Sequence, residues 1–322
     1  MKRNPAPLTV LASMIMMAAA PAHAADDQFT NPLLASGPDP WIVRDGATYY
    51  FMSTEGNRLV IRSARRLGEL RNAQARTVWT PPAKGPNAIS IWAPELHRIG
   101  KSWFIYYTAA EDGHDDDAHR GIFVLENSAA HPTQGTWMDR GKLATAHSGI
   151  DGTTFAYKSQ RYFVYSPYVG PQSDLAIVRM SNPWTLEGPE VIIARPDLGW
   201  EDRGGRRILE GPEFLQGPTG DLFLTYSAGA CWSDDYALGL LHAQAGSDPM
   251  KSEVWHKARQ PVLKTSEANS VYATGHNGFF TSPDGREHWI VYHAYDAEHD
   301  ASPTLRLAEL RWDTDGWPVA LS

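Results

Sequence analysis

The chain has 322 residues, a formal net charge of −8 at pH 7 and one cysteine. The acidic balance and the lack of any lysine or arginine run argue against a nucleic-acid partner, and a lone cysteine excludes an intrachain disulfide. The composition favours strands and turns, with 12 Trp, 13 Tyr and 10 Phe beside 27 Gly and 23 Pro, because aromatic residues suit pleated surfaces and Gly and Pro punctuate short strands.

The first 24 residues resemble a secretory signal peptide. Two basic residues open the chain, residues 8–20 are apolar and uncharged, and Ala22–Ala24 offers a small-x-small cleavage site. The apolar stretch is short for a membrane span. We therefore expect cleavage after Ala24 and a secreted or periplasmic mature protein of residues 25–322 that is not attached to a membrane. An uncut N-terminal anchor is the alternative.

Five aromatic segments with strand character recur along the rest of the chain, and most of them follow a turn signal such as Asp45-Gly46. A turn followed by such a segment is typical of the second arm of a β-hairpin. The segments are residues 48–52, 103–107, 162–165, 222–226 and 289–293.

A short polar signature that opens with an ionisable side chain precedes each aromatic segment by 8 to 13 residues. The signatures begin 56, 56, 59 and 66 residues apart, so the chain contains five similar units. The ionisable residues are Asp39, Glu95, Asp151, Glu210 and His276.

Five units that can each supply three or four short strands predict an all-β, five-bladed β-propeller in one domain over residues 25–322. If the first arm of each hairpin is innermost, the five ionisable residues occupy equivalent places around a central channel. A β-sandwich whose turns carry acids is the alternative, and the in-phase recurrence disfavours it. Helical character is confined to residues 63–75, which are few enough to form only a turn.

Two further features have a plain structural reading. The acidic run Glu111–Asp117 could bind a metal, but a solvated loop between the second and third strands of the second blade is the favoured interpretation. Cys231 follows an apolar strand, so we interpret it as a packed thiol and not as a nucleophile.

Carboxyl groups that converge on a channel can hydrolyse glycosidic bonds. One carboxyl group must be protonated to donate to the leaving oxygen, and the other must be ionised, to activate water or to attack directly. Neighbouring like charges and burial raise one pKa, while donors and solvent keep another low. Each acid alone is weak support, but three acids and a histidine around one channel indicate this chemistry.

At this point the motifs resemble, in order, those of glycoside hydrolase family 43. They are Asp39-Pro40-Trp41, Trp92-Ala93-Pro94-Glu95, Asp151, Glu210-Gly211-Pro212 and Gly275-His276-Asn277. The resemblance covers essentially the whole predicted mature chain. It implies a five-bladed propeller that acts with inversion on arabinosides or xylosides.

The resemblance also implies roles. Asp39 matches the general base, Glu210 the general acid, and Asp151 the carboxylate that orients the acid and raises its pKa. His276 matches a channel histidine that helps to hold a cation, often calcium, through water; the chemistry itself requires no cofactor. Glu213 is a rival for Glu210. Because residues three apart on a strand face opposite sides, we expect only one of the two to face the channel, and the motif favours Glu210.

Four residues are candidate substrate contacts. Trp92 and Trp41 can stack on a sugar or pack between blades, and Trp92 is the better candidate for stacking. Glu95 can contact substrate or support the channel, with the support role slightly favoured. Arg306 matches a late arginine that touches the sugar, although Arg311 is close enough to compete.

The segments 91–97, 119–126, 227–232 and 275–279 resemble exo-acting α-L-arabinofuranosidases of the family. The expected activity is release of terminal α-L-arabinofuranose, with inversion, from arabinan or arabino-oligosaccharides of plant cell walls. β-Xylosidase and endo-arabinanase activities are the alternatives, and a propeller that binds sugars without cleaving them is the alternative of another class. Inversion predicts that the two catalytic carboxyl groups lie roughly 6.5–9.5 Å apart.

Overall fold

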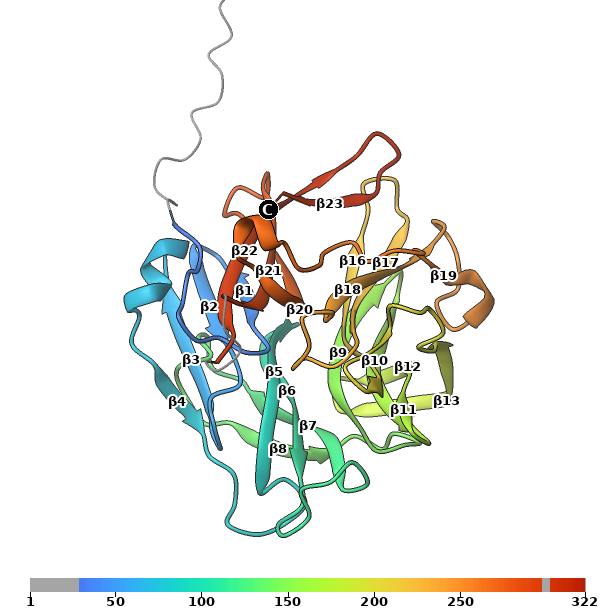
Figure 1. Ribbon diagram of the computed structural model, residues 1–322. Helices are drawn as coiled ribbons and strands as arrows, with labels where there is room; N and C mark the ends of the chain where they lie inside the picture. Colours follow the sequence, from blue (N-terminus) through green and yellow to red (C-terminus); the bar gives the residue numbers. More distant parts are fainter. Residues whose placement is uncertain (1–28, 297–301, 322) are drawn as a thin grey trace, which may run out of the picture.

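A computed structural model describes residues 29–296 and 302–321, and the predicted signal peptide lies outside this part of the chain. Within the described ranges, regular structure is strand apart from three short 3-10 helices: Leu67–Asn72 in the segment where helical character was expected, Ser252–Val254 and Glu267–Asn269. Five main sheets surround a common centre (Figure 1), which confirms the predicted five-bladed β-propeller.

Each blade is an antiparallel meander whose strands follow one another along the chain. Blade 1 contains β1 (Trp41–Asp45), β2 (Thr48–Met52), β3 (Leu59–Ala64) and β4 (Arg76–Trp79). Blade 2 contains β5 (Ile89–Ile99), β6 (Ser102–Ala110), β7 (Arg120–Asn127) and β8 (Met138–Lys142). Blade 3 contains β9 (Gly149–Tyr157), β10 (Gln160–Val169), β12 (Leu175–Asn182) and β13 (Thr185–Ala194), with β11 (Gln172–Ser173) beside β10.

Blade 4 contains β16 (Leu209–Gln216), β17 (Leu222–Ala228), β18 (Ala237–Ala243) and β19 (His256–Lys257). Blade 5 contains β20 (Tyr272–Thr281), β21 (His288–Tyr295), β22 (Thr304–Trp312) and β23 (Pro318–Leu321). A small hairpin of β14 (Asp202–Arg203) and β15 (Arg206–Arg207) lies outside the blades.

The repeat found in the sequence corresponds to this arrangement. The five aromatic segments fall in the second strands β2, β6, β10, β17 and β21. The first strands β1, β5, β9, β16 and β20 contact one another in a closed ring, so they are the innermost strands. The acidic run 111–117 lies between β6 and β7, as expected, and its residues are mostly exposed.

The expectation that the five ionisable residues occupy equivalent places is wrong in detail. Asp39, Asp151 and His276 do share one position, the left-handed residue of the blade, whereas Glu210 lies one residue before that position and Glu95 two residues after it. A β-bulge lies between Trp92 and Glu95. An added residue in one strand of a pair shifts the register and re-aims the side chains that follow. Counting from the signature alone therefore misplaces Glu95 most.

The feature that truly repeats is a residue with left-handed backbone near the channel in each blade. These residues are Asp39, Ala93, Asp151, Gly211 and His276, with φ between 43° and 55°. Such a conformation is unfavourable for residues other than glycine and persists where the surroundings enforce it. In four blades the amide N–H of this residue donates to a side chain that lies on or just after the second strand of the preceding blade, and we call these contacts the inter-blade amide bonds. They join Asp39 to His293 (3.1 Å), Ala93 to Thr54 (2.8 Å), Asp151 to Thr108 (3.0 Å) and His276 to Ser227 (2.7 Å).

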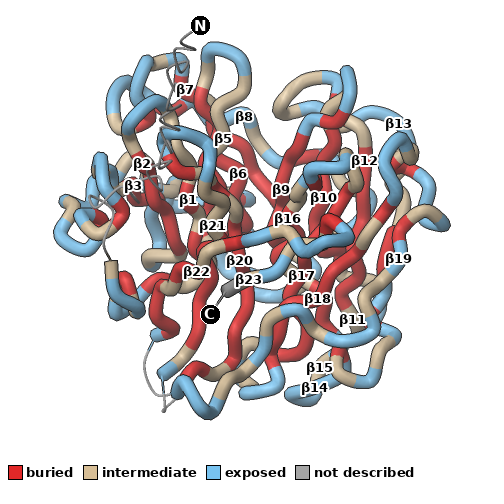
Figure 2. Tube along the Cα trace, turned by 90° about the horizontal axis from the view of Figure 1, so that it is seen from above, coloured by how far each residue is buried: buried red, intermediate tan, exposed pale blue. Residues whose placement is uncertain are grey.

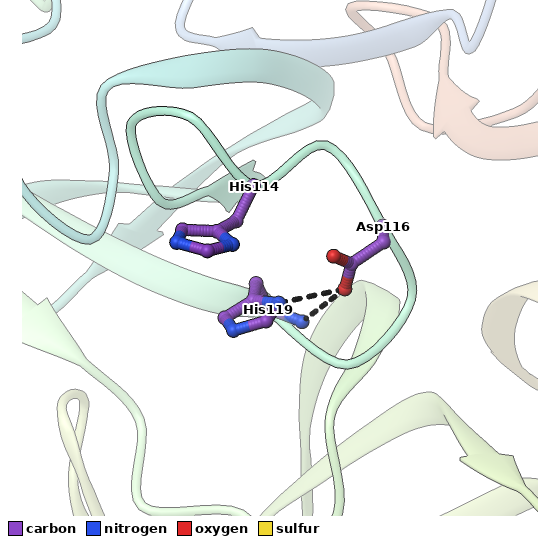
Figure 3. A group of neighbouring side chains, drawn as sticks. All are labelled: His114, Asp116 and His119. Carbon is purple, nitrogen blue, oxygen red and sulfur yellow. Dashed lines mark hydrogen bonds and ion pairs between the residues drawn. The ribbon is translucent and has the colours of Figure 1, made fainter.

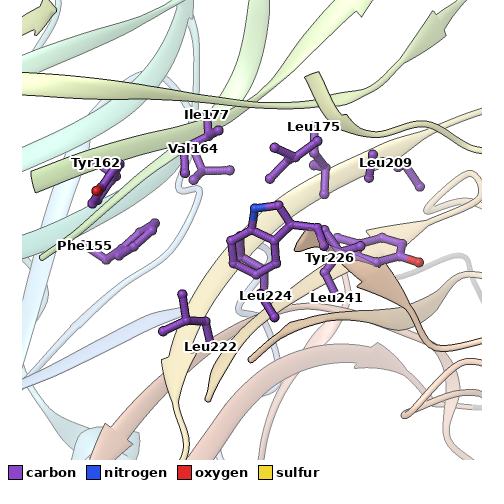
Figure 4. Close-up of a cluster of buried hydrophobic side chains, with 14 of the residues drawn as sticks. Phe155, Tyr162, Val164, Leu175, Ile177, Leu209, Leu222, Leu224, Tyr226 and Leu241 are labelled. Atoms are coloured by element: carbon purple, nitrogen blue, oxygen red, sulfur yellow. The ribbon is translucent and has the colours of Figure 1, made fainter. Parts of the chain in front are cut away.

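The hydrophobic core is divided among the interfaces between blades. Five clusters of buried side chains each join neighbouring blades, and buried residues follow the strands while exposed residues gather in the loops (Figure 2). In the cluster between blades 3 and 4, Phe155 and Leu175 of one blade pack with Leu224 and Tyr226 of the next (Figure 4). Burial of such side chains is the main force that holds the ring together.

Residues that precede blade 1 complete blade 5. Leu34 pairs with Leu305 of β22, and the side chain of Asn31 bonds both main-chain groups of Leu307, at 2.7 Å and 3.0 Å. The amide of Gly37 donates to Pro303 at 2.9 Å, and a Cβ on Gly37 would lie 2.8 Å from the Cβ of Leu305. We call residues 31–37 the closing segment. In the described part of the chain, no helix is both long and apolar enough to span a bilayer.

Candidate active site

A cavity of about 350 Å³ opens at the channel and is lined by residues from all five blades. Five of the residues singled out from the sequence line it together: Asp39, Trp92, Asp151, Glu210 and His276. Its volume is at the small end of the range for ligand pockets, roughly 300–1,000 Å³. The propeller therefore brings the predicted carboxyl groups to one place.

Glu210 is the second residue of β16 and is partly exposed to the cavity. Burial, and next the charge of Asp151, raise the pKa of Glu210 to about 8. The hydroxyl of Tyr236 donates to Oε1 of Glu210 at 2.7 Å and opposes this shift. Tyr236 can come this close because position 275 is glycine, where a Cβ would lie 2.0 Å from the tyrosine ring. At neutral pH, Glu210 is therefore a carboxylic acid that can donate a proton.

Asp151 is buried behind Glu210, and its Oδ2 accepts a hydrogen bond from the amide of Gly211 at 3.0 Å. Burial, and next the charge of Asp39, hold the pKa of Asp151 well above its usual range. In the other four blades, the amide of the left-handed residue donates to a side chain on or just after the second strand of the preceding blade. In blade 4 that residue is Gly211, and its amide donates to Asp151 and not to Ser166 of β10. The hydroxyl of Ser166 is buried without a hydrogen-bond partner among the described residues. Asp151 thus replaces Ser166 and fixes the backbone next to Glu210.

Asp39 keeps a side-chain exposure of 22% and faces the cavity. The hydroxyl of Thr54 donates to its Oδ2 at 2.6 Å, and Nδ1 of His276 lies 3.2 Å from its Oδ1. The same His276 nitrogen lies 4.0 Å from Oδ2 of Asp151. Asp39 is consequently held by a donor on one side while it remains accessible to water on the other.

His293 supports Asp39 from behind. It is buried, and burial lowers the pKa of His293 to about 4. Its Nδ1 accepts the main-chain N–H of Asp39 at 3.1 Å, a role that requires a ring nitrogen without a proton. At neutral pH, His293 is therefore uncharged and positions the backbone of Asp39.

One side of the cavity is bounded by a chain of contacts that we call the arginine rim. The guanidinium of Arg120 lies 4.2 Å from the ring of Trp92 and bonds Asp117 at 3.1 Å. Asp117 also pairs with Arg206, which lies 5.5 Å from the ring of Tyr168. The rim joins blades 2 and 3 to the β14–β15 hairpin. It presents two cations and two aromatic rings to a ligand. Of these residues, only Trp92 was predicted from the sequence.

Two predicted substrate contacts lie elsewhere. Trp41 packs between blades 1 and 2, where its Nε1 donates to the carbonyl of Leu96 at 2.8 Å and its ring lies 4.8 Å from that of His97. Arg306 does not line the cavity and instead bonds Asp296 and, at 3.3 Å, the hydroxyl of Thr304. Both side chains are engaged in structural contacts.

Glu95 also lies outside the cavity lining. It is buried, with the imidazole of His97 2.8 Å from its Oε2, and it contacts Glu213 of β16. Burial and the nearby carboxyl of Glu95 raise the pKa of Glu213 well above its usual range. Of the two rival residues, Glu210 lines the cavity and Glu213 does not. A β-bulge lies between Glu210 and Glu213, so the alternation rule for a regular strand does not apply to this pair.

The residues around His276 fit a directly bound cation poorly. Calcium takes six to eight oxygen ligands, whereas Nδ1 of His276 already faces the carboxylates of Asp39 and Asp151. Across the described ranges, only His114, Asp116 and His119 form a group of three or more such side chains with metal-ligand spacing. The water-mediated cation at His276 stays a prediction, and no step below uses it.

Cys231 lines the cavity but is not a nucleophile. Burial, and next the charge of Glu210, raise the pKa of Cys231 to about 12. The thiolate is the reactive form of cysteine, so the side chain is an inert thiol at working pH, in line with the sequence interpretation.

A protonated carboxyl group and a water-accessible carboxylate that share one sugar-sized cavity are the two parts that cleavage of a glycosidic bond requires. Fold and site together define a glycoside hydrolase.

Comparison with known proteins narrows this class. The model of glycosyl hydrolases family 43 matches residues 29–318, and the chain belongs to this family. The chain is 38% identical over 331 residues to an extracellular exo-α-(1→5)-L-arabinofuranosidase of Streptomyces avermitilis, covering 96% of this chain and 68% of that protein. It is 39% identical over 284 residues to a protein of the same name from Streptomyces chartreusis, covering 85% of each.

A solved structure agrees. The crystal structure of an α-L-arabinofuranosidase from Lactobacillus brevis superposes with a TM-score of 0.83 at 30% identity, and the match covers 89% of this chain and 94% of that one.

Proposed function

We propose that this glycoside hydrolase releases terminal α-L-arabinofuranose from arabinan or arabino-oligosaccharides, with inversion, outside the cytoplasm. The observation that carries the proposal is the pair formed by Glu210, whose pKa is about 8, and the water-accessible Asp39 in one cavity. The choice of sugar rests on the relatives, since proteins 38% and 39% identical to this chain are named exo-arabinofuranosidases.

The proposed mechanism uses each carboxyl group in one state. Glu210 gives its proton to the glycosidic oxygen as the bond to the anomeric carbon breaks. Asp39 takes a proton from a water molecule whose oxygen attacks that carbon from the opposite face. Asp151 acts on Glu210 in two ways, because the ionised form of Asp151 raises the pKa of the acid and its hydrogen bond fixes the backbone of Gly211.

Exo action is supported by the arginine rim. A cavity that Trp92, Asp117 and Tyr168 help to bound on one side suits the end of a chain better than its middle. An endo-arabinanase would need a groove that is open at both ends. A β-xylosidase would share the same carboxyl groups, so only substrate tests separate it from the proposal. A sugar-binding propeller without turnover does not account for a Glu210 held protonated.

The first test compares two substrates that differ in leaving group. Cleavage of α-1,5-arabinobiose expels an alkoxide that needs a proton, whereas 4-nitrophenyl α-L-arabinofuranoside expels a stable phenolate. Glu210→Gln should lower kcat on arabinobiose by about 10²–10⁴-fold and affect the aryl substrate much less. Asp39→Asn should abolish both reactions, since activation of water is needed for each.

Three outcomes would contradict the proposal. Equal losses on both substrates for Glu210→Gln would remove it as the acid. Good activity on xylobiose with none on either arabinoside would favour a β-xylosidase. Binding of arabino-oligosaccharide without any turnover by the unchanged protein would favour the binding module. NMR of the first product should show the β anomer of arabinose, and the α anomer would rule out inversion.

A further inference from the structure

The loop between β6 and β7 gathers three metal-ligating side chains that the active site does not use. His114, Asp116 and His119 each offer one ligand atom, and these atoms lie within 4.8 Å of one another (Figure 3). The two imidazole rings stack with centroids 4.2 Å apart and an interplanar angle of 25°. The three side chains point toward one another although they come from different positions of an exposed loop.

The carboxylate of Asp116 is held in place by the loop itself. Its Oδ1 accepts hydrogen bonds from the amides of Ala118 at 3.0 Å and His119 at 3.2 Å. The Nδ1 of His119 lies 2.7 Å from the same oxygen. The Asp116 carboxylate is therefore already ordered before an ion binds. This preorganisation lowers the entropic cost of binding.

The neighbouring aspartates explain why Asp116 is available. Asp115 and Asp117 on either side pair with Arg120, and Asp117 pairs with Arg206 as well. Asp116 pairs with His119 alone among the described side chains. Of three successive aspartates, two are neutralised by arginines of the arginine rim, and the third faces two imidazoles.

The donor set indicates which ion fits. Two imidazole nitrogens and one carboxylate oxygen suit zinc and neighbouring divalent transition metals, whereas calcium and magnesium prefer sites built from oxygen atoms. Three protein ligands and one water complete the four-coordinate arrangement of zinc. The 4.8 Å spread is wider than the ligand spacing of a closed tetrahedral site, so binding requires the exposed loop to draw the three side chains closer together.

We propose that His114, Asp116 and His119 bind one Zn²⁺ ion on the β6–β7 loop. The ion takes the place of the proton between Asp116 and His119 and ties the loop to the residue that precedes β7. Because Asp117 of the same loop holds Arg120 and Arg206, the bound ion fixes one wall of the cavity from outside. The site is distinct from the catalytic carboxyl groups and does not depend on the identity of the substrate.

The test is a direct binding measurement without sugar. The full protein is freed of metal with a chelator and titrated with Zn²⁺ in a calorimeter. We expect one saturable site per chain, and His114→Ala and His119→Ala should each weaken its affinity by at least roughly tenfold, since even the loss of an indirect partner of a metal ligand has effects of this size. His256→Ala, which removes an exposed histidine of β19, is the matched control and should leave binding unchanged.

A second measurement identifies the geometry. Co²⁺ in place of Zn²⁺ should give the strong visible absorption of a four-coordinate nitrogen and oxygen site, and both histidine variants should lose it. No saturable Zn²⁺ binding, or binding that survives either histidine substitution, overturns the proposal. Displacement of the Zn²⁺ by an equal concentration of Ca²⁺ overturns it as well. None of these outcomes bears on the glycosidase activity, so the two proposals fail separately.

Discussion

The hydroxyl of Tyr236 influences how readily Glu210 loses its proton. The hydrogen bond at 2.7 Å stabilises the ionised form of Glu210, while burial and the charge of Asp151 disfavour that form. The net result is a pKa of about 8. A single oxygen atom therefore helps to set the upper end of the pH range in which the acid can act.

Tyr236→Phe should raise the pKa of Glu210 further, because the variant loses a donor to the carboxylate. Activity that needs protonated Glu210 falls as the pH rises through this pKa, so the basic limb of the kcat profile should move to higher pH. The measurement is kcat for α-1,5-arabinobiose against pH. The acidic limb serves as the internal control, and a basic limb that stays in place or moves to lower pH would contradict the assignment.

The sequence predicted the residues that carry a repeated signature and missed those that do not. Asp39, Asp151 and Glu210 recur at regular spacing, and a ring of blades necessarily brings them together. Arg206 and Tyr236 come from connections without a repeat, and what they contact depends on how distant loops meet in three dimensions. Sequence patterns do not contain the three-dimensional arrangement of these loops.

At the scale of the strand, the inter-blade amide bonds enforce the left-handed residues that the channel needs. The hydroxyl of Ser227 in β17 accepts one of these bonds from the amide of His276. Ser166 occupies the equivalent position in β10, but its hydroxyl makes no hydrogen bond to the described residues. The β-bulges beside these positions could not be predicted, because the alternation rule assumes a regular strand. This is why Glu95 was expected at a place where the structure does not put it.

Ser227→Ala should reduce the free energy of unfolding by about 1–3 kcal/mol, the range for a buried group left without its partner. Ser166→Ala is the matched control, with the same change at the same position of the preceding blade. It should cost nothing or slightly stabilise the protein, since a buried hydroxyl without a partner is removed. Urea unfolding of both variants measures the difference, and equal losses would argue against the inter-blade amide bonds.

At the scale of the whole molecule, a propeller must join its last blade to its first. The five-fold repeat predicted the ring, because each unit can bury its faces only against its neighbours. The closing segment was not predicted, since residues 31–37 carry no repeat and pair with β22, far away in the chain. Besides its main-chain hydrogen bonds, the segment uses the side chain of Asn31, which bonds both main-chain groups of Leu307 as a neighbouring strand would.

Asn31→Ala should lower the stability of the ring by about 1–3 kcal/mol, from two hydrogen bonds of about 0.5–1.5 kcal/mol each. For a protein of this size the melting temperature should fall by several degrees. Asn269→Ala, at an exposed site, is the control and should have no measurable effect. A melting temperature unchanged in Asn31→Ala would show that the main-chain hydrogen bonds and apolar contacts of the closing segment hold it without the Asn31 side chain.

The inter-blade amide bonds have a mechanical consequence. The amides of Asp39, Asp151 and His276 are each anchored to the neighbouring blade, and that of Gly211 is anchored to Asp151. Any sliding of one blade against the next therefore moves one of the proposed catalytic groups relative to the others. Displacements near 1 Å can cost about a hundredfold in rate. The turnover rate therefore depends on the rigidity of the whole ring. Substitutions in the outer strands can slow the reaction even though they do not contact the substrate.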